Sequence, residues 1–175
     1  MEELRLVTPD ASMLEEIRAY RQAMLEAGSA MDGTCSLKDF EAPAAWIAYN
    51  EAMLDEARVP EGMVPSTEFV CVRESDGRIV GMLNLRHRLN DYLLAYGGHI
   101  GYSVRPDERR KGYAHWMLSQ ALPYCRALGL ERVMVSCIAA NEGSRRTILG
   151  CGGVYESTAH EPEMDVDIER YWITL

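Results

Sequence analysis

Two apolar runs separated by an Asp-Gly turn stand in the middle of the chain and constrain its fold most strongly. The runs cover residues 67–74 and 79–87, and the sequence between them is SDGR. An Asp-Gly pair between two β-type segments is a strong short-range signal for a hairpin. A third strand pattern at 99–106 ends at Pro106 and is followed by a helical pattern at 112–128. The fold must therefore contain an antiparallel hairpin in a sheet, with a helix packed beside it.

The rest of the chain continues the alternation of strand and helix patterns. Further strands are predicted at 3–8, 130–138, 154–159 and 169–175, and further helices at 11–27, 39–57 and within NEGSRRTILG. Residues 28–36, 59–66 and 88–98 have the composition of loops or connections. Pro123 lies inside the 112–128 pattern and predicts a kink or a local break there. The order predicts a single α/β domain that spans residues 1–175.

Composition excludes several classes of function. The net charge of -9 argues against general nucleic-acid binding and is compatible with a cationic or amine-bearing small partner. No apolar run is long enough to cross a bilayer, and the acidic N-terminus lacks the pattern of a signal peptide. The five cysteines form no CxxC pair, which predicts reduced, mostly buried thiols, no metal site and a cytoplasmic location.

A cluster of positive charge stands where the 112–128 helix is predicted to begin. Arg109, Arg110 and Lys111 come directly before Gly112, and Ala114 follows in the first turn. A helix N-terminus leaves backbone N–H groups unpaired and carries partial positive charge, so it can hold an anion such as a diphosphate. A glycine lets the anion approach the backbone. On physical grounds alone, an anion site and a solvated run of charge both remain open.

A resemblance to a known family narrows these alternatives. Arg109-x-x-Gly112-x-Ala114 after the strand IGYSVRP resembles the acetyl-coenzyme A signature of the GNAT superfamily of N-acetyltransferases. The segment from Asn141 through Ser144 to the glycines of CGG resembles the asparagine-bearing helix of the same family. The resemblance implies a mixed, mostly antiparallel twisted sheet with a central parallel strand pair and flanking helices. It also implies transfer of an acetyl group from acetyl-CoA to a primary amine of a small molecule or peptide.

The resemblance also implies positions for the cofactor. The pantetheine arm is expected between the strands at 99–105 and 132–138, and the pyrophosphate at residues 109–114. The residues expected to contact acetyl-CoA are Tyr102, Ser103, Val104, Arg109, Arg110, Lys111, Gly112, Tyr113, Ala114, Asn141 and Ser144. For Arg145 and Arg146, the sequence leaves two roles open: a contact with a phosphate, or a place on a solvated helix surface.

The sequence departs from the family pattern at the position of the usual proton donor. Many members carry a tyrosine seven positions after the asparagine, and this chain has Ile148 there. The catalytic candidates are therefore His99 as a base, Tyr102 as a carrier of a proton and Ser144 beside the thioester. His99 is equally compatible with a structural histidine at a strand edge, and His87 is a second candidate for the base. Tyr155 is a further, weaker candidate for carrying a proton.

Three points remain open at the level of the sequence. A non-catalytic module that binds coenzyme A, and an enzyme that transfers a longer acyl group, are alternatives to the acetyltransferase. The acetyl acceptor has no decodable motif, since loops and N-terminal helices carry specificity in such folds. Formation of a homodimer is also left open.

Overall fold

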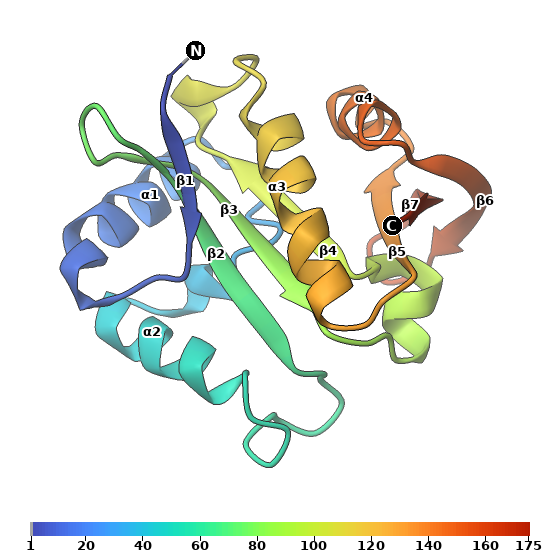
Figure 1. Ribbon diagram of the computed structural model, residues 1–175, viewed down its shortest axis with the longest axis horizontal. Coiled ribbons are helices and arrows are strands. Elements are labelled where there is room, and N and C mark those ends of the chain that lie inside the picture. The colour runs from blue at the N-terminus through green and yellow to red at the C-terminus, as the bar shows by residue number, and fades with distance from the viewer. Residues whose placement is uncertain (1) are drawn as a thin grey trace.

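The computed structural model describes residues 2–175, whose strands form one twisted sheet with helices on both faces (Figure 1). The strand order across the sheet is β1-β2-β3-β4-β5-β7-β6. Neighbouring strands are antiparallel except for β4 and β5, which are parallel. The expected mixed sheet with one central parallel pair and flanking helices is therefore confirmed.

The elements follow the predicted order. The strands are β1 (Leu4–Val7), β2 (Ser66–Arg73), β3 (Ile79–Arg86), β4 (Ile100–Val104), β5 (Arg132–Ile138), β6 (Val154–Glu161) and β7 (Val166–Thr174). The helices are α1 (Leu14–Glu26), α2 (Pro43–Ala52), α3 (Tyr113–Ala127) and α4 (Glu142–Gly150), with a short π-helical turn at Leu93–Gly97. None of the helices in residues 2–175 is both long enough and apolar enough to cross a membrane.

The predicted hairpin consists of β2 and β3. Gly77 adopts a φ of 71°, a left-handed conformation that glycine reaches without steric cost. The turn closes with a hydrogen bond of 2.9 Å from the Arg73 N–H to the Arg78 carbonyl. The ladder then pairs Glu68 with Asn84, which brings two polar side chains together on one face of the sheet.

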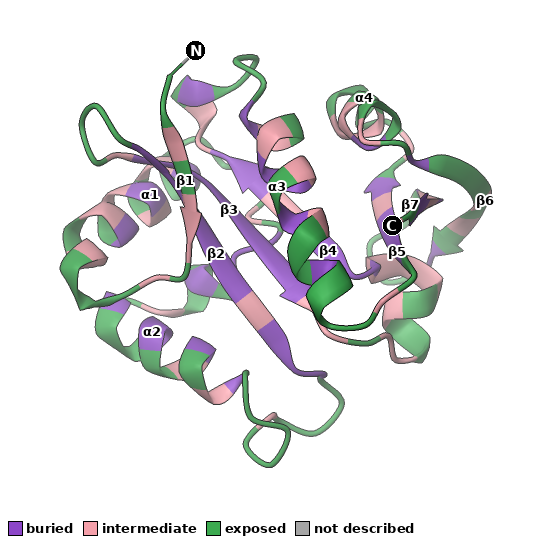
Figure 2. Cartoon of the chain, in the orientation of Figure 1, coloured by how far each residue is buried: buried purple, intermediate pink, exposed green. Residues whose placement is uncertain are grey.

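Each face of the sheet buries its own apolar cluster (Figure 2). Alternate residues of β2 point to opposite faces, as expected for a strand. Val70 and Val72 pack with α1 and α2, whereas Phe69 and Cys71 pack with α3. The helices thus bury two layers of side chains, and most of α4 and β6 remains exposed at one side of the molecule.

Two details of the predicted helices are wrong. The helix expected at 39–57 begins only at Pro43, because proline is favoured at the first position of a helix. It ends at Ala52, because the chain then enters tight turns that Asp55 stabilises. Helix α3 continues through Pro123, so of the predicted kink or local break, the break is absent.

Candidate functional site

Strands β4 and β5 pair at a single position and then separate. Ile100 pairs with Val135, and no later residue of β4 has a partner on β5. The Arg105 N–H donates to the carbonyl of Val80 on β3. In an antiparallel ladder, alternate residues direct their N–H and C=O groups toward the partner strand, so those of Tyr102 and Val104 are directed away from β3. Two stretches of backbone without a strand partner therefore face a gap between parallel strands, as the family resemblance implied.

A row of unpaired backbone donors lies at the end of this gap. Among residues 2–175, no backbone N–H from Arg109 to His115 donates to a protein acceptor. Arg110 and Gly112 have positive φ values of 65° and 86°. A Cβ at Gly112 would meet no atom within 4 Å, so the backbone there is open to a ligand. Consecutive free N–H groups at a helix N-terminus form an anion-binding surface.

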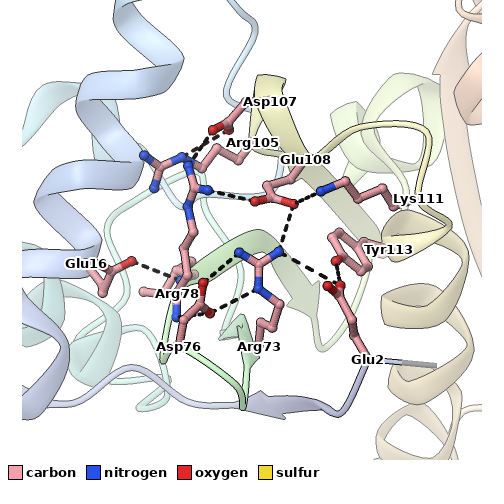
Figure 3. A network of polar contacts seen from close by, with 11 residues as sticks. Glu2, Glu16, Arg73, Asp76, Arg78, Arg105, Asp107, Glu108, Lys111 and Tyr113 are labelled. Carbon is pink, nitrogen blue, oxygen red and sulfur yellow. Dashed lines mark hydrogen bonds and ion pairs between the residues drawn. The ribbon is translucent and has the colours of Figure 1, made fainter.

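The three cations before α3 have different surroundings, of which Figure 3 shows those of Lys111. Lys111 donates to the buried carboxylate of Glu108 at 2.6 Å. Arg109 donates through Nε to the Val104 carbonyl at 3.0 Å, which ties the loop to the end of β4. Arg110 is exposed and has no hydrogen bond or ion pair within the described part of the chain. Arg110 is therefore the cation most available to a ligand.

Glu108 is the centre of a buried ionic network (Figure 3). Its two carboxylate oxygens accept from Arg73 at 3.0 Å and from Arg78 at 2.8 Å, in addition to Lys111. Burial acts to raise the pKa of Glu108, but the hydrogen bonds from Lys111 and Arg73 outweigh it and hold the pKa below its usual range. The network links the β2–β3 hairpin to the loop before α3 and so fixes where the helix begins.

Tyr102 and Ser144, both predicted as catalytic candidates, lie in contact. The Tyr102 hydroxyl and Ser144 Oγ are 2.7 Å apart, although 42 positions separate the residues in the sequence. Asn141 caps α4 by accepting from the Ser144 N–H at 3.0 Å, which fixes the first turn of the helix. Burial raises the pKa of Tyr102, and the Ser144 hydrogen bond opposes that rise, so the phenol is protonated at neutral pH.

Ile148 fills the position where many family members carry a tyrosine. Its side chain is fully buried, and a Cβ on Gly153 would lie 2.5 Å from its Cγ2. The residue is therefore part of the packing under the turn that follows α4. A tyrosine hydroxyl does contact the first turn of α4, but it comes from Tyr102 on β4.

His99 has the surroundings of a structural histidine. The Met134 N–H donates to His99 Nδ1 at 2.9 Å, and the ring is buried and packs edge-on against Trp172. Burial and then the charge of Arg86 lower the pKa of His99 to about 4. With Nδ1 engaged, the neutral ring carries its proton on Nε2, which favours the structural interpretation over that of a base.

Replacing His99 with glutamine is expected to flatten the dependence of stability on pH. In the unfolded chain the histidine takes up a proton near pH 6.5, whereas the folded protein resists protonation until about pH 4. Wild-type stability therefore falls as pH drops through this window. Glutamine still offers an acceptor to the Met134 N–H but does not titrate. Urea midpoints measured at intervals from pH 7.5 to 4.5 would test this.

Equal pH slopes for the two proteins would contradict the low pKa. The same variant also tests the role of His99 in catalysis. We expect turnover to fall by less than about tenfold, whereas removal of a general base costs about 10²- to 10⁴-fold.

The remaining predicted residues lie apart from the gap or have structural partners. Ser103 Oγ bonds to the Tyr20 hydroxyl on α1 at 2.9 Å, and the Tyr113 hydroxyl is engaged by Glu2. Ala114 lies partly exposed in the first turn of α3. The other positions are engaged as follows: Arg145 with Glu169, Arg146 with Glu142, His87 with Thr67, and Tyr155 with Thr158.

Sequence reasoning missed a second group of polar residues on the other face of β4. Asp32, Asn84 and Arg86 line a cavity of about 860 Å³ beneath residues 28–36, and Glu68 lies behind it with one oxygen unpaired. Burial raises the pKa of Glu68 well above its usual range, and the hydrogen bond from Asn84 opposes that rise. No local motif marks these residues, because they come from a loop and two strands that meet only in the folded chain.

Comparisons with known proteins agree with this geometry. The sequence model of the acetyltransferase (GNAT) family matches residues 32–152, well over half of the chain. No curated protein matches the sequence. A ribosomal-protein-S5-alanine acetyltransferase from Vibrio fischeri has a similar fold, with a TM-score of 0.76 and 19% identity over 99% of this chain and 94% of that one.

Two further solved structures have the same fold. A spermidine N-acetyltransferase from Vibrio cholerae has a TM-score of 0.67 and 18% identity, over 98% of this chain and 93% of that one. YncA from Salmonella typhimurium, solved with its cofactor acetyl-CoA, has a TM-score of 0.66 and 15% identity, over 98% of this chain and 94% of that one. Taken with the divided strands and the open N-terminus of α3, the family match shows that the chain belongs to the GNAT family of N-acetyltransferases, which use acetyl-CoA as co-substrate.

Proposed function

We propose that residues 1–175 form one acetyltransferase domain that transfers the acetyl group of acetyl-CoA directly to a primary amine. The observation that carries this proposal is the gap between β4 and β5, which leads to the unpaired N–H groups of residues 109–115. An extended pantetheine arm would hydrogen-bond to the backbone of Tyr102 and Val104 as a missing strand would. The pyrophosphate would accept from the N–H groups around Gly112, with Arg110 as the nearest free cation.

Asn141 and Ser144 would lie beside the arm on the opposite wall of the gap. Asn141 Oδ1 is engaged in capping α4, so its amide nitrogen remains free to donate. Tyr113 would contribute through its backbone, since its side chain bonds elsewhere. Ser103 would contribute little, because its backbone pairs with β3 and its side chain bonds to Tyr20. Lys111 would contribute less than Arg110, because Glu108 already compensates its charge.

The chemistry is attack of a neutral amine on a thioester. The nitrogen lone pair forms a C–N bond with the carbonyl carbon, the C–S bond breaks, and the thiolate of coenzyme A leaves. The Val104 N–H is directed into the gap and would donate to the tetrahedral oxyanion. Many family members use a tyrosine at the position of Ile148 to protonate the departing thiolate. Here Tyr102, which is protonated and oriented by Ser144, would give that proton instead.

A non-catalytic module that binds coenzyme A remains the second candidate, favoured by the buried Ile148 at the usual position of the acid. Release of free thiol in the presence of a broad panel of amines separates the two. Binding of acetyl-CoA without any turnover would support the module.

Replacing Gly112 with alanine is expected to weaken acetyl-CoA binding at least about tenfold, since one lost hydrogen bond to a charged group costs roughly 1.5–3 kcal/mol. A methyl group there would stand between the phosphate and the backbone. Isothermal titration calorimetry with acetyl-CoA measures the effect. Gly129 provides a matched control at the other end of α3, since it has a φ of 81° and equally open surroundings.

Gly129→Ala should show the same backbone strain as Gly112→Ala and bind acetyl-CoA like the wild type. An equal loss in both variants would point to destabilised α3 and not to the phosphate site. If the wild-type protein failed to bind acetyl-CoA at millimolar concentration, the proposed function would be wrong.

A further inference from the structure

Residues 28–36, most of which line the cavity, lie against β4, the strand that also borders the gap for acetyl-CoA. Gly33 makes the contact: a Cβ there would lie 2.2 Å from the Gly101 carbonyl oxygen and 2.5 Å from the Tyr102 nitrogen. Only glycine permits this approach, and its φ of 67° also favours glycine. The loop that lines the cavity therefore reaches the backbone of Tyr102, which also borders the gap.

Arg86 is a partly buried cation in this cavity without a counter-charge. Its Nη1 donates to the carbonyls of Gly97 and Gly98 at 3.0 and 3.2 Å. Within residues 2–175, no carboxylate lies close enough to Arg86 to form an ion pair. Glu68 is near, but it is fully enclosed and hydrogen-bonded to Asn84. A guanidinium removed from water without an anion is costly, so the free edge of Arg86 favours an anionic ligand.

Asp32 is an anion in the same cavity, also without a partner. Its side chain lines the cavity but is also exposed to solvent, and it forms no hydrogen bond or ion pair with any described residue. Burial by the cavity walls raises the pKa of Asp32, and the positive charge of Arg86 opposes that rise. The two groups thus influence each other electrostatically but do not touch. Among the described residues, Lys38 is the only other cation that lines the cavity, and it is exposed at the rim.

Two unpaired charges of opposite sign that face one cavity match a ligand that carries both charges. We propose that this cavity binds the acetyl acceptor as a small zwitterion, an amino acid whose amino group contacts Asp32 and whose carboxylate contacts Arg86. The inference rests on the proposed acetyltransferase function and names the acceptor of that same site. The apolar side chains of Leu25, Met31, Met53, Met63 and Val64 complete the cavity wall and suit an aliphatic side chain.

Asp32 would also take part in the proton balance. The bound ammonium group gives one proton to the Asp32 carboxylate, and the resulting neutral amine attacks the thioester carbon. The second proton lost from nitrogen ends on the coenzyme A thiol, while Asp32 releases its proton to the solvent of the open cavity. The products are the N-acetyl amino acid, coenzyme A and one proton.

The test compares the twenty amino acids with their carboxamides as acceptors in an assay for thiol release. Leucine is expected to exceed leucinamide in kcat/KM by at least about tenfold, since a carboxylate–arginine pair exceeds a neutral hydrogen bond in strength. Arg86→Gln should remove that preference, and Asp32→Asn should lower kcat/KM for both compounds. Lys38→Gln is the matched control at the rim and should keep the preference.

The outcomes distinguish a failure of this inference from a failure of the proposed function. Acetyl-CoA binding with equal use of leucine and leucinamide, or no use of any amino acid, would overturn this inference and leave the proposed cofactor site standing. A preference lost in Lys38→Gln and kept in Arg86→Gln would also overturn it. Absence of acetyl-CoA binding in the wild type would instead refute the proposed function. Circular dichroism checks that Arg86→Gln is folded, and Asp32→Asn gives an independent result if it is not.

Discussion

Replacing Glu108 with alanine is expected to lower the melting temperature by about 10 °C, because it removes the shared acceptor of three cations. Arg73 is buried with Glu108 and would keep only Asp76 and the more distant Glu2. Removing one partner of a buried ion pair costs about 3 kcal/mol or more. Each kcal/mol shifts the melting temperature of a chain of this size by about 2–4 °C. Differential scanning calorimetry measures the shift.

The control for this variant is Asp107→Ala. Asp107 also pairs with Arg78, but it is exposed, and exposed pairs contribute about 1 kcal/mol or less. We expect acetyl-CoA affinity to fall in Glu108→Ala and to stay unchanged in Asp107→Ala, because the buried Glu108 joins three cations around the loop before α3, whereas Asp107 is exposed. Equal melting temperatures for the two variants would show that the buried network does not stabilise the fold.

The parts of the fold that the sequence predicted correctly depend on local signals. The hairpin is specified by a turn of only four residues, with Asp76-Gly77 at its centre, between two apolar runs. Gly112, placed directly before a 3.6-residue apolar period, marks the beginning of α3 in the same way. Pro123 is the exception, because tertiary packing of α3 on β3 and β4 keeps the helix continuous where a local rule predicts a break.

The parts that the sequence did not predict depend on contacts between distant segments. Nothing near Asp32 indicates that Gly33 lies against Gly101, or that Arg86 would face the same cavity from β3. Three adjacent cations before α3 look alike in the sequence. Only the folded chain shows that Glu108 engages Lys111, and that Arg110 remains free.

Replacing Tyr102 with phenylalanine is expected to lower kcat about 10²-fold, the low end of the range for loss of a general acid. The low end applies because a thiolate is already a tolerable leaving group. The KM for acetyl-CoA and the melting temperature should change little, since the backbone of residue 102 and the packing of the ring are kept. Because burial raises the pKa of Tyr102, the phenol stays protonated throughout the assay range, and the loss should be the same from about pH 6 to 9.

Ser144→Ala should lower kcat less than Tyr102→Phe, since the Tyr102 hydroxyl would lose its orienting partner but keep its proton. Initial rates of thiol release at saturating acetyl-CoA separate the two variants. Wild-type turnover in Tyr102→Phe would mean that the thiolate leaves without an acid, and that the contact with Ser144 only holds β4 against α4.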